Sequence, residues 1–547
     1  MREQSSVGSG RVSTGPSSSD DPLAALDTGG PRVDDLLRRA ARRIPDRVAL
    51  RTPEGAVTYA RLDDQVSRCA VAIRGALGET AAVVGLAAVL DTAFAVAYYG
   101  IARSGNIIAI VNPLLREDGL VHVLGISRAR AVVVPPEVYR RLSTLRDRLP
   151  DLELVVLTHR DAEGTPRDAP TLAELVAATS GQPLPGMDRD PEAVICIQFT
   201  SGTTGVSRAV QLTHRNLVVN AAQTARAHHL DSSSVILNCL PNFHPIFLNI
   251  AATVTATQVL SAAEDVVETI TIANQCQATH YYSLPVQMAR LAADPRLAGL
   301  RLHSVRVFLS GGSALAPATA TTLSEHFGIP VLQGYGLAET SASTHIDRFD
   351  RSKIGSVGPP VVGTECRIVD VDTREPLLIE ARGEVQIRGP QLMVGYLDSG
   401  DNAIDAEGWL STGDVGYLDD EGYLFVVDRL KDVFKCDNEL VAPAEIERVL
   451  HRHPAVADCA VVDYPDEFSG AVAYALIVSR DGAADLAEIA EFVNGQVPYY
   501  QRLRHVELRE YIPRSPNGKI LHRELREQVR ARRMPSQETP PHSGCSR

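Results

Sequence analysis

The stretch Thr200-Ser201-Gly202-Thr203-Thr204-Gly205-Val206-Ser207-Arg208 decides how the rest of this chain is organised. The apolar run Ala193 to Ile197 before it predicts a buried strand, and the residues from Asn216 onward predict a helix. Glycines let a loop turn its N–H groups toward an anion, hydroxyls add donors, and Arg208 adds a permanent cation. The stretch therefore indicates a phosphate-binding loop, although not the P-loop of NTPases. The alternative is a flexible linker, which a preceding buried strand disfavours.

Length and composition place the chain among ordinary globular proteins. A chain of 547 residues is too long to fold around a single hydrophobic core, so we expect at least two domains. It is 44% hydrophobic and 22% charged, and its net charge of −13 argues against a nucleic-acid partner. The eight cysteines are scattered without a C-x-x-C pair. We therefore expect no zinc site, no disulfide framework and a cytoplasmic location.

Three segments bear on targeting. Residues 1–30 are rich in Ser, Gly, Asp and Pro and lack an apolar core, which predicts a disordered leader and no signal peptide. Residues 531–547 predict a disordered tail. The run Ala81 to Ala102 is apolar enough to resemble a membrane span, but Asp91 lies in its middle. A buried strand followed by a buried helix explains this run better, so no membrane span is expected.

The order of apolar patterns predicts the fold class. Short β-rich runs alternate with helical runs from Ala81 to Val134 and again after the loop, which is typical of βαβ units. Gly355 to Val427 predicts short strands and turns, and a smaller α+β pattern follows Asp428. We therefore predict a large α/β domain over residues 31–428, with two βαβ-type sheets and a β-rich subdomain. A small α+β domain would follow over residues 429–530.

Five motifs, in this order, resemble those of the adenylate-forming superfamily. That superfamily contains acyl- and aryl-CoA ligases, firefly-type luciferases and peptide-synthetase adenylation domains, and the chain looks closest to ligases of the 4-coumarate and fatty-acid type. The resemblance extends from about Leu36 to Glu527. The motifs are Thr200–Gly205, Gly334–Glu339, Ser411–Asp414, Asp428–Asp432 and Pro513–Ile520.

The resemblance implies a role for each matched residue. It assigns ATP binding to Thr200, Ser201, Gly202, Thr203, Thr204, Gly205, Gly312, Tyr335, Gly336, Asp414 and Arg429. It assigns catalysis to Lys519, Arg208 and His244, a hinge to Lys431 and Mg²⁺ to Glu339. The chemistry of the side chains agrees, because glutamate suits Mg²⁺ and aspartate can accept two hydrogen bonds from a ribose diol. Taken singly, each also has a structural explanation, such as a turn aspartate, an exposed lysine or a core aromatic ring.

The implied activity is ATP-dependent adenylation of a small organic acid, with pyrophosphate release and transfer to CoA or a carrier-protein thiol. ATP and Mg²⁺ are the implied cofactors, with CoA as a third. Five residues depart from the family pattern: Arg208 replaces a lysine, Ser207 and Ala209 replace the proline and glycine around it, Ala338 replaces a threonine, and Asn438 replaces a glycine beside the thiol tunnel. Because Asn438 would crowd that tunnel, a second function is possible. In this alternative, the protein is an ATP-dependent diazotase that activates nitrite and diazotises an aryl amine without CoA. A non-catalytic nucleotide-binding protein is a third reading, which the retained Glu339, Asp414 and Lys519 oppose.

The identity of the acid is less constrained by the sequence. Four segments are expected to line its pocket, and their aromatic and histidine residues favour a compact, aromatic acid over a long chain. The segments are Phe243–Asn249, Tyr281–Pro285, Ser310–Ser313 and Thr340–His345.

Overall fold

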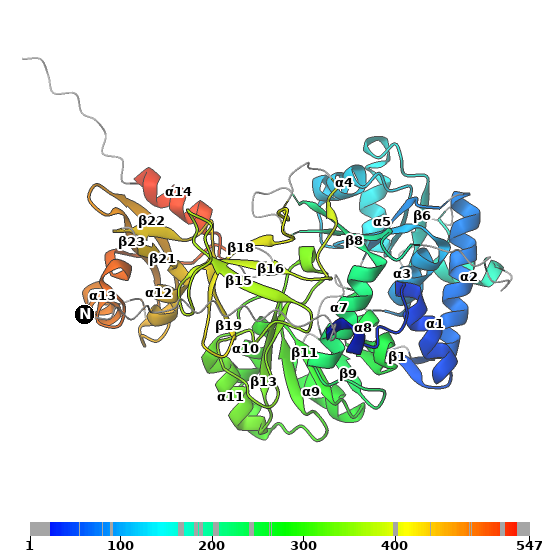
Figure 1. Cartoon of the computed structure of the whole chain (residues 1–547), viewed down its shortest axis with the longest axis horizontal. Helices are drawn as coiled ribbons and strands as arrows, with labels where there is room; N and C mark the ends of the chain where they lie inside the picture. Colours follow the sequence, from blue (N-terminus) through cyan, green and yellow to red (C-terminus); the bar gives the residue numbers. More distant parts are fainter. Residues whose placement is uncertain are drawn as a thin grey trace, which may run out of the picture.

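The computed structural model describes residues 22–532, except 54, 79, 88–90, 162–168, 180–183, 185–189, 201–206, 240–244, 262, 264, 398–402, 438, 481, 483 and 515–519. Figure 1 shows a large α/β region, coloured blue to yellow, and a smaller region, coloured orange to red, at one end. The large region contains three sheets, and the small region contains a fourth. The predicted fold class is confirmed.

The first sheet has eight strands, and its inner pairs are parallel. The strands, in spatial order, are β14 (His345–Ile346), β13 (Val331–Tyr335), β12 (Val307–Ser310), β11 (His280–Ser283), β9 (Val235–Asn238), β10 (Thr257–Leu260), β1 (Val48–Thr52) and β2 (Gly55–Thr58). Helices connect most of the parallel strands and cover the sheet, so its inner strands are largely buried, as the four residues of β11 and of β12 are. The helices of this layer are α8 (Ile246–Val254), α9 (Val266–Gln275), α10 (Pro285–Ala293) and α11 (Pro317–Phe327).

The second sheet has seven strands and carries the phosphate-loop hairpin near one edge. Its strands, in spatial order, are β17 (Gly395–Tyr396), β8 (Ala209–Thr213), β7 (Val194–Phe199), β4 (Ile107–Val111), β3 (Val83–Ala87), β5 (Ala131–Val134) and β6 (Leu154–Leu157). The helices of this region are α1 (Val33–Arg43), α2 (Tyr59–Leu77), α3 (Thr92–Ser104), α4 (Glu117–Ile126), α5 (Pro136–Ser143), α6 (Leu172–Ala178) and α7 (His214–Ala227).

The apolar run near residue 90 forms strand β3 and helix α3, as expected. Every α3 residue from Phe94 to Ser104 is buried, and α2 approaches so closely that a Cβ on Gly100 would lie 2.5 Å from the Cys69 sulfur. Close helix packing in a large core therefore explains the high apolar content of the run. None of the described helices is both long and apolar enough to cross a bilayer.

The third sheet and the small α+β region complete the fold. The third sheet is antiparallel, as the strand and turn pattern predicts, and consists of β15 (Glu365–Val369), β16 (Gly383–Arg388), β18 (Leu410–Leu418) and β19 (Leu424–Arg429). The small region has its own buried core. It contains β20 (Phe434–Cys436), β21 (Glu439–Val441), α12 (Pro443–Leu450), β22 (Val456–Asp466), β23 (Gly470–Ser479), α13 (Leu486–Asn494), β24 (Leu503–Leu508) and α14 (His522–Arg532).

Two expectations from the sequence need correction. The phosphate loop does not lead from a strand into a helix, because β8 follows the loop and pairs antiparallel with β7 before α7 begins. The predicted disordered leader is too long, because Pro22–Ala25 forms a 3₁₀-helix and Asp27 forms an ion pair with Arg39 of α1. Residues 1–21, and the tail beyond residue 532, lie outside the described residues.

Candidate active site

The base of the phosphate loop is closed by two hydrogen bonds. The Thr200 N–H donates to the Arg208 carbonyl oxygen at 3.0 Å, and the Arg208 N–H donates to Thr200 Oγ1 at 3.2 Å. These bonds continue the pairing of Phe199 with Ala209, so the loop is the tip of the β7–β8 hairpin. The predicted ligands between them, Ser201 to Gly205, lie outside the described residues.

Arg208 is connected to Glu339 through Tyr396, a residue absent from the predicted site. The Arg208 guanidinium carbon lies 3.4 Å from the centre of the Tyr396 ring, and the Tyr396 hydroxyl donates to Glu339 Oε1 at 2.8 Å. Tyr396 belongs to β17, which pairs with β8 at the edge of the second sheet. No local pattern in the sequence marks Tyr396, because its position depends on this long-range strand pairing.

The segment that carries Tyr335 and Glu339 turns very tightly. A Cβ on Gly336 would lie 1.6 Å from the carbonyl oxygen of Ala342, so only glycine fits there. Beyond the turn, Asn220 of α7 donates to the Ser343 carbonyl at 2.7 Å and accepts from the Ser343 N–H at 3.1 Å. The turn therefore fixes the tyrosine and the glutamate relative to each other, and α7 holds the returning strand.

Asp414 is the centre of a second group of predicted residues. The Tyr335 hydroxyl donates to its Oδ2 at 2.5 Å, and Arg429 Nε lies 2.9 Å from its Oδ1. Gly413, with φ of +69°, makes the turn before it, and the Asp414 side chain is 5% exposed. Burial, together with the charge of Asp414, raises the pKa of Tyr335 well above its ordinary value, so the hydroxyl remains a donor. These contacts hold the Asp414 carboxylate beside the Tyr335 ring, and a carboxylate can accept about four hydrogen bonds in all.

The remaining predicted site residues are less closely connected. Gly312 follows β12 with φ of +87°, and a Cβ on the preceding Gly311 would lie 3.6 Å from the Gly334 carbonyl oxygen, which brings these two glycine segments together. Lys431 is exposed, in a turn that the Asp432 N–H closes by donating to the Arg429 carbonyl. His244, Asn438 and Lys519 lie outside the described residues.

His345 lies at the end of the segment expected to line the acid pocket. It is fully buried, and its ring centre lies 6.1 Å from that of Tyr335. Burial lowers the pKa of His345 to about 3, so the imidazole is neutral at physiological pH. Its Nδ1 lies 3.0 Å from Thr344 Oγ1, and its Nε2 has no partner among the described residues. The neutral ring therefore carries no charge to attract a carboxylate, and its contribution to a pocket would be its shape and a hydrogen bond from one ring nitrogen.

The described residues contain no group of three or more His, Cys, Asp or Glu side chains that could hold a metal ion. Glu339 is therefore a single candidate ligand, and only its Oε1 is engaged, by Tyr396, within the described stretches of the chain. Mg²⁺ in nucleotide sites keeps several waters and binds phosphate oxygens with one or two protein carboxylates. The donor set around Glu339 fits that mode of binding.

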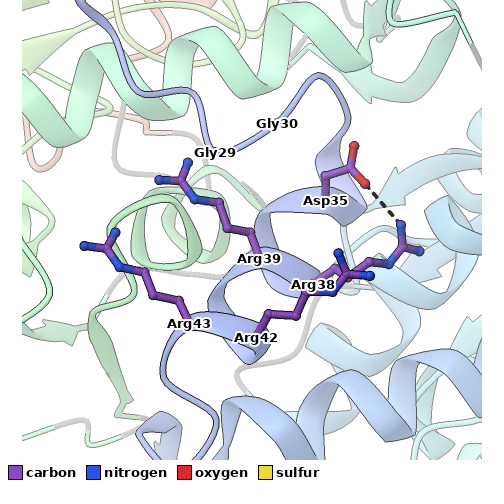
Figure 2. A pocket seen from close by; sticks show the side chains of 7 residues that line it. All are labelled: Gly29, Gly30, Asp35, Arg38, Arg39, Arg42 and Arg43. Atoms are coloured by element: carbon purple, nitrogen blue, oxygen red, sulfur yellow. Dashed lines mark hydrogen bonds and ion pairs between the residues drawn. The ribbon is translucent and has the colours of Figure 1, made fainter.

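A surface groove of about 530 Å³ lies over helix α1 and the segment before it (Figure 2). The groove is lined by Gly29, Gly30, Asp35, Arg38, Arg39, Arg42 and Arg43. Arg38 pairs with Asp35, and Arg39 pairs with Asp27. No lining residue belongs to the predicted motifs, so the groove does not belong to the candidate nucleotide site.

Comparison with known proteins identifies the family. The model of the AMP-binding enzyme family matches residues 37–397, and that of the AMP-binding enzyme C-terminal domain matches residues 445–519. A 4-coumarate–CoA ligase from Pinus taeda is 31% identical over 456 residues, which are 80% of this chain and 83% of that protein. 4-coumarate–CoA ligase 2 from Oryza sativa subsp. japonica is 32% identical over 465 residues, covering 80% of this chain and 81% of that protein.

Solved structures show the same fold at lower sequence identity. The anthranilate CoA ligase AuaEII in complex with anthranoyl-AMP has a TM-score of 0.82 at 24% identity, covering 92% of this chain and 98% of that chain. ATP-bound MatB from Rhodopseudomonas palustris has a TM-score of 0.81 at 24% identity, covering 91% and 99%. Both family models and the curated relatives agree with the resemblance that the five motifs carry. The chain belongs to the AMP-binding enzyme family and is an adenylate-forming ligase of the acyl- and aryl-CoA ligase type.

Proposed function

We propose that this protein uses ATP to activate a small aryl or acyl acid as its acyl-AMP, and then transfers the acyl group to the thiol of CoA. The observation that supports this most directly is the hydrogen-bonded group of Tyr335, Asp414 and Arg429, joined by one tight turn to Glu339. Asp414 has acceptor capacity for a ribose diol, and Arg208 and Glu339 lie together where charged phosphates and a cation would meet.

In the first half-reaction, a carboxylate oxygen of the acid attacks the α-phosphorus of ATP, and the bond from that phosphorus to the bridging oxygen of pyrophosphate breaks. Both reactants are anionic, so cations must offset their repulsion. We assign this to Lys519 at the carboxylate and α-phosphate, and to Arg208 at the outer phosphates. Mg²⁺ held by Glu339 would neutralise phosphate charge. Tyr335 and Asp414 would orient the nucleoside.

In the second half-reaction, the sulfur of a thiol attacks the acyl carbon, and the bond from that carbon to the AMP oxygen breaks. The thiol proton is lost to solvent. The relatives named as 4-coumarate–CoA ligases support CoA as the acceptor, and a carrier-protein thiol is chemically equivalent. These relatives also favour an acid over nitrite, so we do not propose the diazotase reaction. The tunnel residue Asn438 lies outside the described residues.

The proposed cycle has two domains, with the boundary between residues 428 and 429 and a rotation about Lys431. Support for a boundary in this region comes from the two family models, which leave residues 398–444 between them. Support for rotation comes from Lys431, whose exposed side chain would not obstruct a change in its backbone angles. The cysteines among the described residues are free thiols, which supports a reducing, cytoplasmic setting.

A pyrophosphate-release screen tests the proposal. Fatty, aryl and amino acids, and nitrite with an aminoaryl acid, would each be incubated with ATP and Mg²⁺, with and without CoA. We expect release with an aryl or short acyl acid, and a thioester when CoA is present. Release with nitrite alone, or an adenylate that never reacts with CoA, would contradict the ligase assignment.

The ring contact of Arg208 predicts that lysine is a poor substitute at this position. Replacement of Arg208 by lysine should lower kcat/KM for ATP about tenfold, because an ammonium group cannot stack flat on Tyr396 or present a fork of donors. Initial rates of pyrophosphate release at varied ATP would measure this. The matched control is Arg215→Lys, at an exposed ion pair with Glu192, which should leave the rate unchanged. Wild-type or higher activity in Arg208→Lys would show that the stacking has no function.

A further inference from the structure

A buried ion pair lies between two helices of the small α+β region. His522, the first residue of α14, has its Nε2 2.9 Å from Glu447 Oε1 of α12. The same Oε1 accepts from the Val461 N–H of β22 at 2.8 Å. The side chains of His522 and Glu447 are 13% and 10% exposed, so water screens the pair weakly. The pair thus joins three elements of the small region.

The same helix α12 is hydrogen-bonded to β19, the last strand of the large region. Asp428 of β19 accepts from the Arg429 N–H at 2.8 Å and from the Ala444 N–H at 2.9 Å. Ala444 is the second residue of α12, so Asp428 satisfies one of the free N–H groups at the start of that helix. A continuous path therefore runs from the end of β19 through α12 to the first residue of α14.

His522 also follows closely on the segment expected to carry the catalytic lysine. The Leu521 N–H donates to the Pro513 carbonyl at 3.0 Å, and Arg514 forms a bridge with Ile520. These contacts close the base of segment 515–519, which itself lies outside the described residues. Lys519 is three residues before His522, which limits the separation of their Cα atoms to about 11 Å.

The charges around His522 favour its protonated form. Burial acts against the cation, but the hydrogen bond and charge of Glu447, with the charges of Asp432 and Asp428, raise the pKa of His522 above its ordinary value. Burial also raises the pKa of Asp428 to about 6. Three arginines near His522 in the sequence are paired with other carboxylates. Arg514 pairs with Asp458, and both Arg526 and Arg530 pair with Asp463. Protonated His522 is thus the cation that pairs with the Glu447 carboxylate.

We propose that His522 is a positioning residue for adenylation: its protonated imidazole, held by Glu447, fixes the base of the loop that carries Lys519 to α12. This inference rests on the proposed function, in which Lys519 contacts the carboxylate and the α-phosphate. Glu447 holds the imidazolium, and the bond weakens when the imidazole loses its proton. The connection from His522 to α12 is then weaker, and Lys519 is placed less accurately.

The pH dependence follows from the direction of the shift. The folded protein binds the His522 proton more tightly than the unfolded chain does, so the ion pair is complete below the ordinary pKa of about 6.5. The pair is lost as the pH rises through the raised pKa of the folded protein. The rate of adenylation should therefore fall on the alkaline side, well before lysine itself titrates near about 10.4.

The test compares His522→Arg and His522→Asn with the wild type, using the acid that the screen finds most active. Arginine is a permanent cation, so His522→Arg should retain most of the activity and lose the alkaline fall between about pH 7 and 9. Asparagine cannot form the ion pair, so His522→Asn should reduce pyrophosphate release about tenfold at about pH 6.5. The control is His303→Arg at an exposed histidine, which should keep the wild-type profile.

A second measurement needs no substrate. NMR titration of the His522 imidazole should give a pKa above the ordinary value in the wild type and a lower one in Glu447→Gln. An unchanged alkaline fall in His522→Arg, or wild-type rates in His522→Asn, would overturn the inference. Full activity of Lys519→Ala would instead overturn the proposed role of the lysine, and the imidazole titration would still report whether the pair exists.

Discussion

Replacement of Lys519 by alanine is expected to reduce acid-dependent pyrophosphate release by about 10²–10³-fold. In the proposed first half-reaction, its ammonium group contacts the carboxylate and the α-phosphate at the same time. Removing that cation leaves the charge that develops in the transition state without its closest partner. Coupled detection of pyrophosphate, with the acid identified by the screen, would measure the loss.

Arg523→Ala is the matched control for this experiment. Arg523 is also a cation of the small α+β region, and it forms an exposed ion pair with Glu527 within helix α14. Surface pairs contribute little, about 0–1 kcal/mol, so this variant should keep its rate of pyrophosphate release. Near-normal release by Lys519→Ala would refute the proposed role, and an equal loss in both variants would point to a general effect of removing positive charge.

Replacement of Gly336 by alanine is expected to have the largest effect on stability at the candidate site. The new methyl group would lie 1.6 Å from the Ala342 carbonyl oxygen, and that atom belongs to the backbone and cannot rotate away. The turn would have to open, which should destabilise the protein by about 3 kcal/mol or more. Urea unfolding followed by circular dichroism would measure the change, and ATP-dependent activity should be lost because Tyr335 and Glu339 both move.

Gly75→Ala separates this steric effect from the general effect of adding a methyl group. Gly75 lies inside α2, where a Cβ would meet nothing within 4 Å. Alanine favours a helix over glycine by about 1 kcal/mol, so this control should be slightly stabilised. A stable, active Gly336→Ala protein would mean that the turn does not hold Tyr335 and Glu339 as the structure indicates.

The sequence alone predicts much of the fold, because most of it is encoded in local patterns. The run near residue 90 forms the expected strand and buried helix. Apolar spacing and the position of Asp91, which caps α3, are short-range signals. The motifs likewise indicate the family and the group of Tyr335, Asp414 and Arg429. The Gly-Tyr-Gly segment and the Thr-Gly-Asp turn are each contiguous in the chain.

The contacts between motifs were decided only by the tertiary structure. Strand β8 was not predicted, although it forms a local hairpin with β7. Its other pairing, with β17, joins segments nearly two hundred residues apart and brings Tyr396 to Arg208 and Glu339. The pair of His522 and Glu447 likewise joins helices that are separate in sequence. The sequence by itself thus predicts which residues carry the chemistry, because motifs are local. The tertiary structure decided which other residues hold the motif residues in place, because strand register and helix packing depend on the whole fold.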